Sequence, residues 1–155
     1  MNITVDKLND DGIVKLLQEH LQDMHAQSPA ESVHALPLQA LKAADLTFWS
    51  ARELGQAIGC IALKQLSSTA GEIKSMRTRE AARGRGVAGA LLQTLLHEAN
   101  QRGYQTLWLE TGSMAFFRPA RRLYKKYGFY ECGPFADYKE DPHSVFMRYD
   151  IRAKR

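Results

Sequence analysis

The sequence has few cysteines and lacks a long apolar run. Two cysteines, Cys60 and Cys132, occur among 155 residues, and their separation fits neither a metal-ligand nor a redox spacing. We expect both to be small buried side chains in a reducing compartment. No apolar stretch approaches the roughly 20 residues that span a bilayer, and the N-terminus has no basic segment followed by an apolar core. These absences predict a cytoplasmic protein with no membrane partner and no metal site.

Two common phosphate-binding motifs are also missing. The chain has no Gly-x-x-x-x-Gly-Lys-Ser/Thr sequence, and no Gly-x-Gly-x-x-Gly follows a predicted strand. Their absence argues against a P-loop nucleotide site and against a dinucleotide site. The length and the 45% content of hydrophobic residues are typical of one domain, so we expect a single domain over residues 1–155.

A basic, glycine-rich turn precedes an apolar helix at residues 83–92. Its three glycines let the backbone approach a ligand closely, so that successive N–H groups can converge on an anion. The helix that follows adds unpaired N–H donors and a dipole that favours negative charge. Arg83 and Arg85 supply formal charge beside it. The run predicts a phosphate cradle, and the alternative is a solvated loop with a sharp bend.

The positive charge is modest and clustered. The formal net charge is +4, and the basic residues gather at positions 77–85, 118–126 and 152–155. The chain shows no recognisable nucleic-acid recognition helix, no zinc site and no aromatic residues placed among the basic ones to stack on bases. We therefore expect no nucleic-acid partner. We assign the first cluster to a phosphorylated small molecule. We expect the cluster at 118–126 to form the solvated face of a short helix, and we expect no specific role for the cluster at 152–155.

Hydrophobic spacing predicts an alternating order of strands and helices. A helix capped by Asp10 or Asp11 should begin near residue 11 and end before Ser28-Pro29, and a second helix over 30–44 should be broken or kinked at Pro37. We expect a mixed sheet with helices on both faces. The remaining predicted helices are 87–102 and 119–127, and the predicted strands are 3–5, 46–52, 57–66, 72–78, 106–109, 129–135 and 144–149.

Two motifs together resemble the GNAT acyl-CoA N-acyltransferases. The run Arg83-Gly84-Arg85-Gly86-Val87-Ala88 is similar to the family signature Arg/Gln-x-x-Gly-x-Gly/Ala, and Leu123-Tyr124 followed by Gly128-Phe129 resembles its second signature. The resemblance covers most of the chain, and the late acidic segment also resembles the small bacterial YsnE-like group. It implies an α/β fold with a mostly antiparallel central sheet of about seven strands, flanked by about four helices. It also implies acetyl-CoA as the cosubstrate.

The resemblance implies how the cosubstrate is held. Its pyrophosphate would contact backbone N–H groups of the turn, and its pantetheine arm would follow strand 72–78, where the Met76 N–H would polarise the thioester carbonyl. Alternatively, Met76 and Ile73 only pack in the core, and Arg83 or Arg85 forms a surface pair with Glu80. The implied cosubstrate-binding residues are Met76, Thr78, Arg83, Gly84, Arg85, Gly86, Val87, Ala88, Gly89 and Ala90.

Acetyl transfer to an amine requires two proton transfers. An alkylammonium has a pKa near ~10, so a proton must leave before nitrogen attacks, and the thiolate must later be protonated. The resemblance implies Tyr124 as the acid, whereas the alternative is a core aromatic. For the base, Glu72 is the first candidate by its resemblance to a family glutamate, and Glu110 is the second. A water chain is the third possibility.

The acceptor is the least determined part. The resemblance implies an acceptor cleft between residues 32–36 and 135–141, where His34 and Asp137, with Glu110, would bind a small-molecule amine. Phe117 stands where many relatives have asparagine, so the segment 112–119 is expected to contact CoA differently. A non-catalytic acyl-CoA sensor that regulates a protein is the alternative function. A homodimer is expected by analogy with other members of the family.

Overall fold

A seven-stranded sheet runs through the centre of the structure, a computed structural model that describes residues 1–151. The predicted mixed, mostly antiparallel sheet is confirmed. Its order is β1-β2-β3-β4-β5-β7-β6, and within residues 1–151 the neighbours pair antiparallel except β4 and β5, which are parallel. The predicted basic tail, 152–155, lies outside the described residues. The strands are β1 (Asn2–Val5), β2 (Leu46–Glu53), β3 (Gln56–Gln65), β4 (Ala70–Thr78), β5 (Thr106–Gly112), β6 (Tyr130–Cys132) and β7 (Ser144–Asp150).

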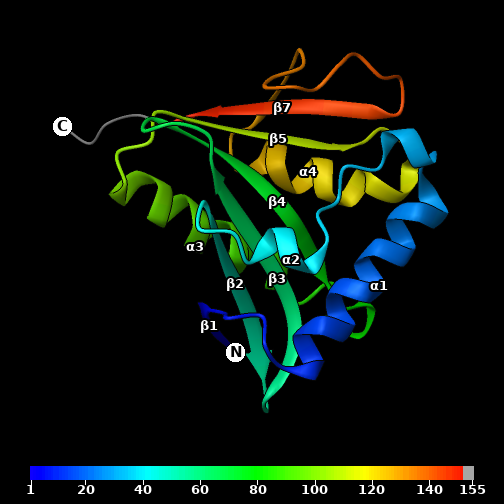
Figure 1. Ribbon diagram of the computed structural model, residues 1–155, viewed down its shortest axis with the longest axis vertical. Helices are drawn as coiled ribbons and strands as arrows, with labels where there is room; N and C mark the ends of the chain where they lie inside the picture. Colours follow the sequence, from blue (N-terminus) through cyan, green and yellow to red (C-terminus); the bar gives the residue numbers. More distant parts are fainter. Residues whose placement is uncertain (152–155) are drawn as a thin grey trace.

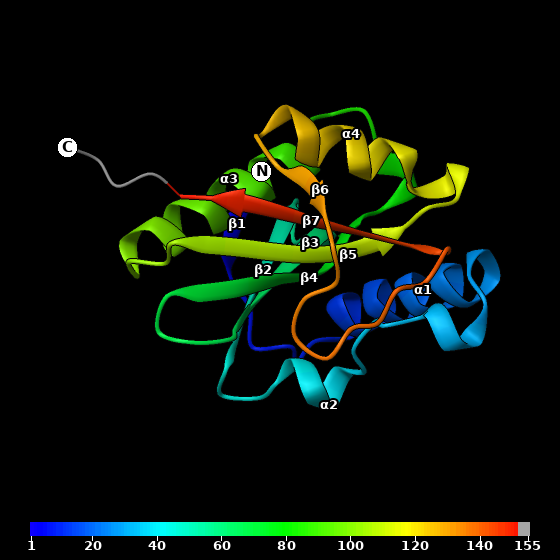
Figure 2. The ribbon, with the colours of Figure 1, turned by 90° about the horizontal axis from the view of Figure 1, so that it is seen from above.

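Helices α1 (Asp11–Gln27) and α2 (Leu38–Leu41) cover one face of the sheet, as Figure 2 shows. Asp10 is the N-cap of α1, and its carboxylate accepts a hydrogen bond of 3.0 Å from the Ile13 N–H. This bond satisfies one of the amide donors that a helix start leaves unpaired. The apolar side of α1 then packs on β2 and β3, so residues 31–35, which follow it, are held beside the sheet.

Helices α3 (Val87–Gln101) and α4 (Arg118–Lys126) lie on the opposite face (Figure 2). Leu91, Leu92 and Leu95 recur at helical spacing and are fully buried against the sheet. Tyr124 on α4 belongs to the same core cluster. The first residues of α3 and the middle of α4 are thereby fixed on one side of the sheet.

Two sequence predictions were wrong in part. Instead of a helix over 30–44, a 3₁₀ turn at Ala30–Ser32 leads into extended chain, and α2 begins only after Pro37. Proline lacks an N–H and disfavours helical backbone in the residue before it, so the chain cannot be helical through this point. The strand predicted over 129–135 is reduced to β6, because Gly133-Pro134 follows it and proline cannot donate to the ladder.

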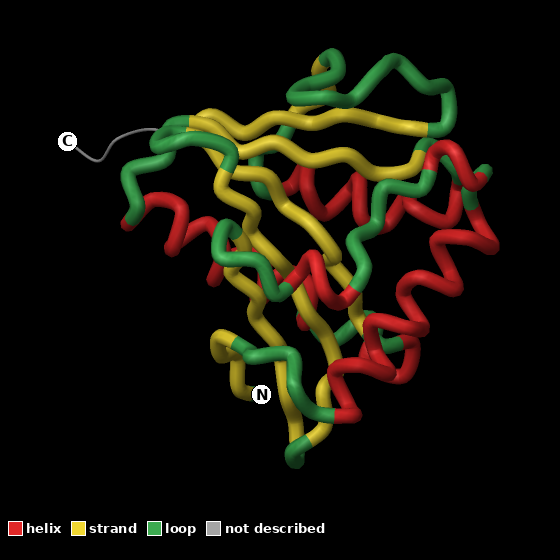
Figure 3. The backbone as a smooth tube through the Cα atoms, viewed as in Figure 1, coloured by secondary structure: helices red, strands yellow, loops and turns green. Residues whose placement is uncertain are grey.

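Strands β4 and β5 separate after a short paired stretch. Their register joins Ala70 to Thr106, Gly71 to Leu107 and Glu72 to Trp108, although β4 continues to Thr78 and β5 to Gly112. Figures 1 and 3 show the two strands starting together and then diverging. The middle of the sheet therefore opens between its fourth and fifth strands.

Candidate active site

A bulge in β4 lies beside the opening. Lys74 pairs with Ala62 and Arg77 with Cys60, so Ser75 and Met76 together face one residue of β3. Ser75 has a φ of 53°, and its carbonyl accepts a hydrogen bond from the Cys60 thiol. Two residues opposite one make a β-bulge, which breaks the ladder locally and re-aims the backbone. Met76 thus stands outside the paired register of β4 and β3.

The predicted phosphate turn has the required backbone. Gly84 and Gly86 have φ values of 78° and 80°, a region that side chains disfavour, and Gly86 is the N-cap of α3 with no side-chain capping bond. The Ala90 N–H donates to the Gly86 carbonyl, so this one of the N–H groups predicted to bind phosphate is already used within the helix. The N–H groups of Val87, Ala88 and Gly89 precede that first helical bond, and helix geometry leaves them without intrahelical acceptors.

The arginines of the turn are accessible. Arg83 is exposed, and Arg85 forms an ion pair with both carboxylate oxygens of Glu53, each at 2.6 Å. Arg85 therefore pairs with Glu53 at the end of β2 and not with Glu80, the partner considered from the sequence. Because such an exposed pair contributes little to stability, Arg85 can exchange this partner for an anion at small cost.

A small pocket of about 90 Å³ occupies the opening between β4 and β5. Met76 from β4, Glu110 from β5 and Tyr124 from α4 all line it. The Tyr124 side chain is 5% exposed, and its hydroxyl lies 3.4 Å from the Met76 sulfur. We call this space the inner pocket. It places a phenol, a carboxyl group and a bulged strand around one small volume.

The inner pocket changes the acidity of its lining groups. Burial raises the pKa of Glu110 to about 7, with the ammonium of Lys74 acting in the opposite direction. Burial also raises the pKa of Tyr124, and the nearby carboxylate of Glu110 adds to that effect. At neutral pH the pocket therefore holds a neutral phenol that can donate a proton and a carboxyl group that can exchange one.

Glu72 is enclosed by two partners. It is 2% exposed, accepts a hydrogen bond of 2.6 Å from the Tyr138 hydroxyl and lies 3.1 Å from the Lys74 ammonium. Lys74 in turn donates to the Tyr138 oxygen at 2.6 Å. The three side chains form a closed triangle, so the carboxylate of Glu72 is already occupied.

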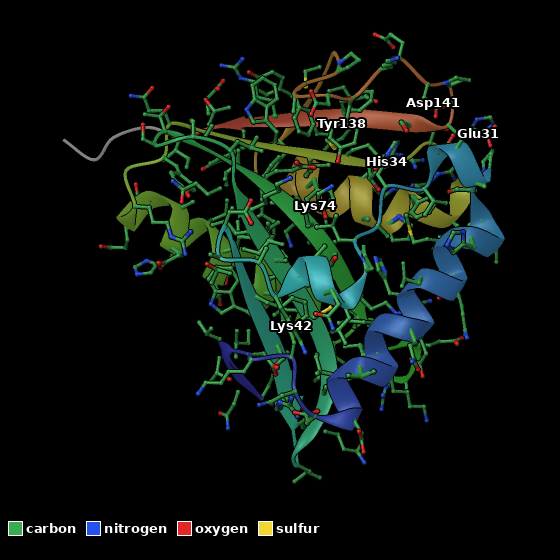
Figure 4. The ribbon with its side chains drawn as sticks, viewed as in Figure 1. Glu31, His34, Lys42, Lys74, Tyr138 and Asp141 are labelled. Atoms are coloured by element: carbon green, nitrogen blue, oxygen red, sulfur yellow. The ribbon has the colours of Figure 1, made fainter. Side chains whose placement is uncertain are left out.

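A larger cleft of about 700 Å³ adjoins the inner pocket. The residues after α1 form one wall and those before β7 form the other, and these are the two segments between which the acceptor cleft was predicted (Figure 4). Ser32 and Asp141 join the two walls through a hydrogen bond of 2.5 Å. His34, Lys74 and Tyr138 line both spaces. We call this larger space the outer cleft, and it leads to the inner pocket past these three residues.

Comparison with known protein families identifies the family of this chain. Residues 13–129 match the Acetyltransferase (GNAT) family. The chain belongs to the GNAT family. It is 53% identical over 147 residues to the N-acetyltransferase YsnE of Bacillus subtilis, covering 95% of this chain and 97% of YsnE. It is 45% identical to the Escherichia coli N-acetyltransferase YedL (94% and 91% covered) and 38% identical to an IAA acetyltransferase of Azospirillum brasilense (94% and 96% covered).

Solved structures agree with the GNAT fold. A Klebsiella pneumoniae protein described as an acyl-CoA N-acyltransferase superposes with a TM-score of 0.79 at 28% identity, covering 97% of both chains. An Elizabethkingia anophelis GNAT acetyltransferase with acetyl-CoA bound superposes with a TM-score of 0.69 at 19% identity, again covering 97% of both. The chain is thus an acyltransferase of the GNAT family, and these solved structures share its fold.

The GNAT fold brings most of the predicted site residues together. Met76, Glu110 and Tyr124 share the inner pocket, and His34 and Asp137 line the outer cleft. Thr78 ends β4 just before the glycine turn, where it pairs with Gly59. The roles assigned to these residues stay predictions.

The residue that departs from the common GNAT pattern also reaches the site. Phe117 is buried and lines the inner pocket, with its ring packed against Gly112. A β-carbon on Gly112 would lie 2.1 Å from that ring, so the glycine makes room for Phe117. The basic face of α4 is not purely solvated either, because Arg121 donates to the carbonyls of Gly112 and Met114 and so ties the helix to the end of β5.

Sequence reasoning did not single out three residues of the site. Lys74 and Tyr138, which lie within the predicted segments 72–78 and 135–141, line both spaces, and His20 lines the inner pocket from α1. One signal was available for Lys74, because Glu72 and Lys74 are two apart on a strand and therefore share a face. Burial lowers the pKa of His20 to about 4, and burial with the Lys74 charge lowers that of His34, so both imidazoles are neutral at pH 7.

Two further findings concern residues 1–151. Within them, no cluster of three or more potential metal ligands occurs among the histidines, cysteines and acidic side chains. No helix in this range is long and apolar enough to cross a bilayer.

We expect Gly86→Ala to weaken acetyl-CoA binding about tenfold or more, because a β-carbon at a φ of 80° strains the turn and displaces the N–H groups that follow. Isothermal titration calorimetry would measure the change. Gly103→Ala is the matched control, since Gly103 has a φ of 77° and the same open surroundings at the other end of α3. Equal affinity in the two variants would contradict a phosphate role for this turn.

Proposed function

We propose that the protein transfers the acetyl group of acetyl-CoA to the amino group of a small molecule, by direct attack within a ternary complex. One observation carries the proposal. The opening between β4 and β5 places Tyr124 and Glu110 at a single pocket, next to the bulged segment that holds Met76. The outer cleft reaches this pocket from the side of α1, so donor and acceptor have separate approaches.

The donor would enter through the phosphate turn. The pyrophosphate accepts hydrogen bonds from the N–H groups of Val87, Ala88 and Gly89, and the positive end of α3 and the exposed Arg83 add attraction. The pantetheine arm then runs along β4 where β5 no longer pairs with it. This path ends at Met76, whose backbone N–H donates to the thioester carbonyl.

The chemistry uses the two titratable groups of the inner pocket. Ionised Glu110 accepts a proton from the acceptor ammonium, and the free amine attacks the polarised carbonyl carbon to form a C–N bond. The N–H of Met76 stabilises the oxyanion of the tetrahedral intermediate. The C–S bond then breaks while Tyr124 donates its proton to the departing sulfur. The attacking nitrogen must lose a second proton to become the neutral amide, and this proton restores the phenol of Tyr124. The products are the N-acetylated amine and CoA thiol, and Glu110 releases its proton to solvent.

Glu110 is favoured as the base over Glu72. The carboxylate of Glu72 is buried and bonded to Tyr138 and Lys74, whereas burial sets the pKa of Glu110 to about 7, where it can both take and release a proton. Glu72 stays the alternative base, reached through Tyr138. In the favoured arrangement Glu72 instead positions Lys74 and Tyr138.

Acetyl-CoA-dependent thiol release by the purified protein tests the function. The panel holds amines, amino acids, short peptides and, because one relative is named IAA acetyltransferase, IAA. We expect turnover on one class of small amine, with mass spectrometry showing one added acetyl group. Tight binding of acetyl-CoA with no acceptor-dependent release would instead favour the non-catalytic acyl-CoA sensor.

A further inference from the structure

The ammonium of Lys74 lies where the inner pocket meets the outer cleft. Its side chain is 12% exposed and lines both spaces (Figure 4). An ammonium has three N–H donors, and the Tyr138 oxygen accepts one of them at 2.6 Å, while the Glu72 carboxylate forms an ion pair with the ammonium at 3.1 Å. Lys74 therefore keeps donor capacity for a group that enters between the two spaces.

Lys74 brings a positive charge to a place whose other charged groups, Glu72 and Glu110, are acidic. The two histidines of the inner pocket are neutral at pH 7, so among the described residues that line it Lys74 is the one formal cation. Glu72, the nearest acid, is already bonded to Tyr138. A carboxylate on the acceptor would be attracted to the Lys74 ammonium, whereas its ammonium group would be attracted to the carboxyl group of Glu110.

Register places Lys74 and Glu110 on facing positions of the opening. Glu72 pairs with Trp108, and Lys74 and Glu110 each lie two residues further along β4 and β5. Because side chains alternate along a strand, Lys74 lies on the same face as Glu72, and Glu110 on the same face as Trp108. The base proposed for the amine and the free ammonium donor thus flank one space, where the strands have already separated.

We propose that the acceptor is an amino acid, in which a carboxylate lies close to the reactive nitrogen. This inference rests on the proposed function and names its substrate class. The carboxylate accepts a hydrogen bond from the Lys74 ammonium while the amino group faces Glu110, so the two charges of the zwitterion meet opposite charges on β4 and β5. Tyr138 and Glu72 hold the Lys74 ammonium in place for this contact.

Matched pairs of acceptors test the proposal. Each pair is an amino acid and the amine that remains without its carboxylate, such as phenylalanine with phenethylamine and tyrosine with tyramine. We expect kcat/KM to be at least about tenfold higher for the amino acid of the preferred pair, the size of one charge-assisted hydrogen bond. Lys74→Met should reduce this ratio by about the same factor.

Two further variants separate recognition from folding. Lys42→Met removes the same charge from an exposed lysine that Figure 4 shows away from both spaces, and it should keep the wild-type ratio. Lys74→Met combined with Glu72→Gln removes both members of the buried pair, so that no uncompensated charge is left behind. Its ratio should match that of Lys74→Met, and acetyl-CoA binding would verify that each variant is folded.

The outcomes distinguish the two proposals. A wild-type enzyme that acetylates the amines as well as the amino acids, or a ratio that Lys74→Met leaves unchanged, overturns the amino-acid inference while the acetyltransferase function stands. If no acceptor raises thiol release although acetyl-CoA binds, the proposed function fails and the inference fails with it. A ratio that falls in both Lys74 variants and not in Lys42→Met supports the inference.

Discussion

Replacing Tyr124 with phenylalanine should lower kcat by about 100-fold or more, the usual loss when a general acid is removed. The buried phenol of Tyr124 is the proton donor that we place beside the CoA sulfur, and phenylalanine keeps its ring but not its proton. The hydroxyl contacts the Met76 sulfur at 3.4 Å, a weak bond whose loss should cost little stability. Steady-state kinetics at saturating acetyl-CoA would measure the effect.

Tyr130→Phe is the control for this substitution. Tyr130 lies on β6, is 46% exposed and donates to Asp150 rather than to any group of the inner pocket. It should keep wild-type kcat. If Tyr124→Phe turned over as fast as Tyr130→Phe and kept the wild-type pH dependence, Tyr124 would be a core aromatic and the acid would have to be sought elsewhere.

The second large effect is expected at Glu110. Wild-type kcat/KM should rise with pH through about 7, where the carboxyl group of Glu110 ionises and becomes able to accept a proton. Glu110→Gln should lower kcat/KM by about 100-fold at pH 7.5 and abolish that rise. A pH–rate profile of both proteins measures the two features together. Glu72→Gln is the comparison, and loss of the rise in that variant alone would identify Glu72 as the base.

As the pH rises, the free energy of unfolding should fall while the activity rises. The folded pKa of Glu110 lies above its unfolded value of 4.5, so the unfolded chain binds fewer protons and stability falls between pH 4.5 and about 7. Above that window the ionised group lowers the free energy of unfolding. Glu110→Gln removes this penalty and should be at least as stable as wild type at pH 8 in thermal denaturation. An inactive but equally stable variant shows that activity was not lost through unfolding.

The parts of the fold that local pattern determines were predictable. The apolar spacing of α1 and α3, the cap at Asp10 and the glycine turn before Val87 all act within a few residues, and the structure confirms them. In the segment 30–44 the break at Pro37 was predicted, but the chain before it forms only the turn Ala30–Ser32, and α2 is limited to Leu38–Leu41. Sequence spacing also could not show that β4 and β5 part after three pairs or that β4 has a bulge at Ser75 and Met76, since pairing between strands depends on how the whole sheet packs.

The site was predictable only where a motif marked it. Tyr124 and the turn belong to motifs, and in the structure Tyr124 lines the inner pocket while the turn leads into α3. Lys74 and Tyr138 lie 64 positions apart, and only the packing of the late loop on β4 brings them within 2.6 Å. Glu72 was ranked above Glu110 by resemblance to a family glutamate, and the sequence could not show that Tyr138 and Lys74 contact the Glu72 carboxylate while Glu110 lines the inner pocket.

The separation of β4 and β5 divides the sheet into two parts, β1 to β4 and β5 to β7, which we call leaves. In the part of the chain that the structure describes, the two leaves are paired with each other only along the short stretch of β4 from Ala70 to Glu72. A cosubstrate arm lying in the gap would act like a missing strand, because it would supply contacts to both leaves that the chain does not provide. Cosubstrate affinity and resistance to unfolding would then be linked, with the bound molecule serving as a structural part of its own enzyme.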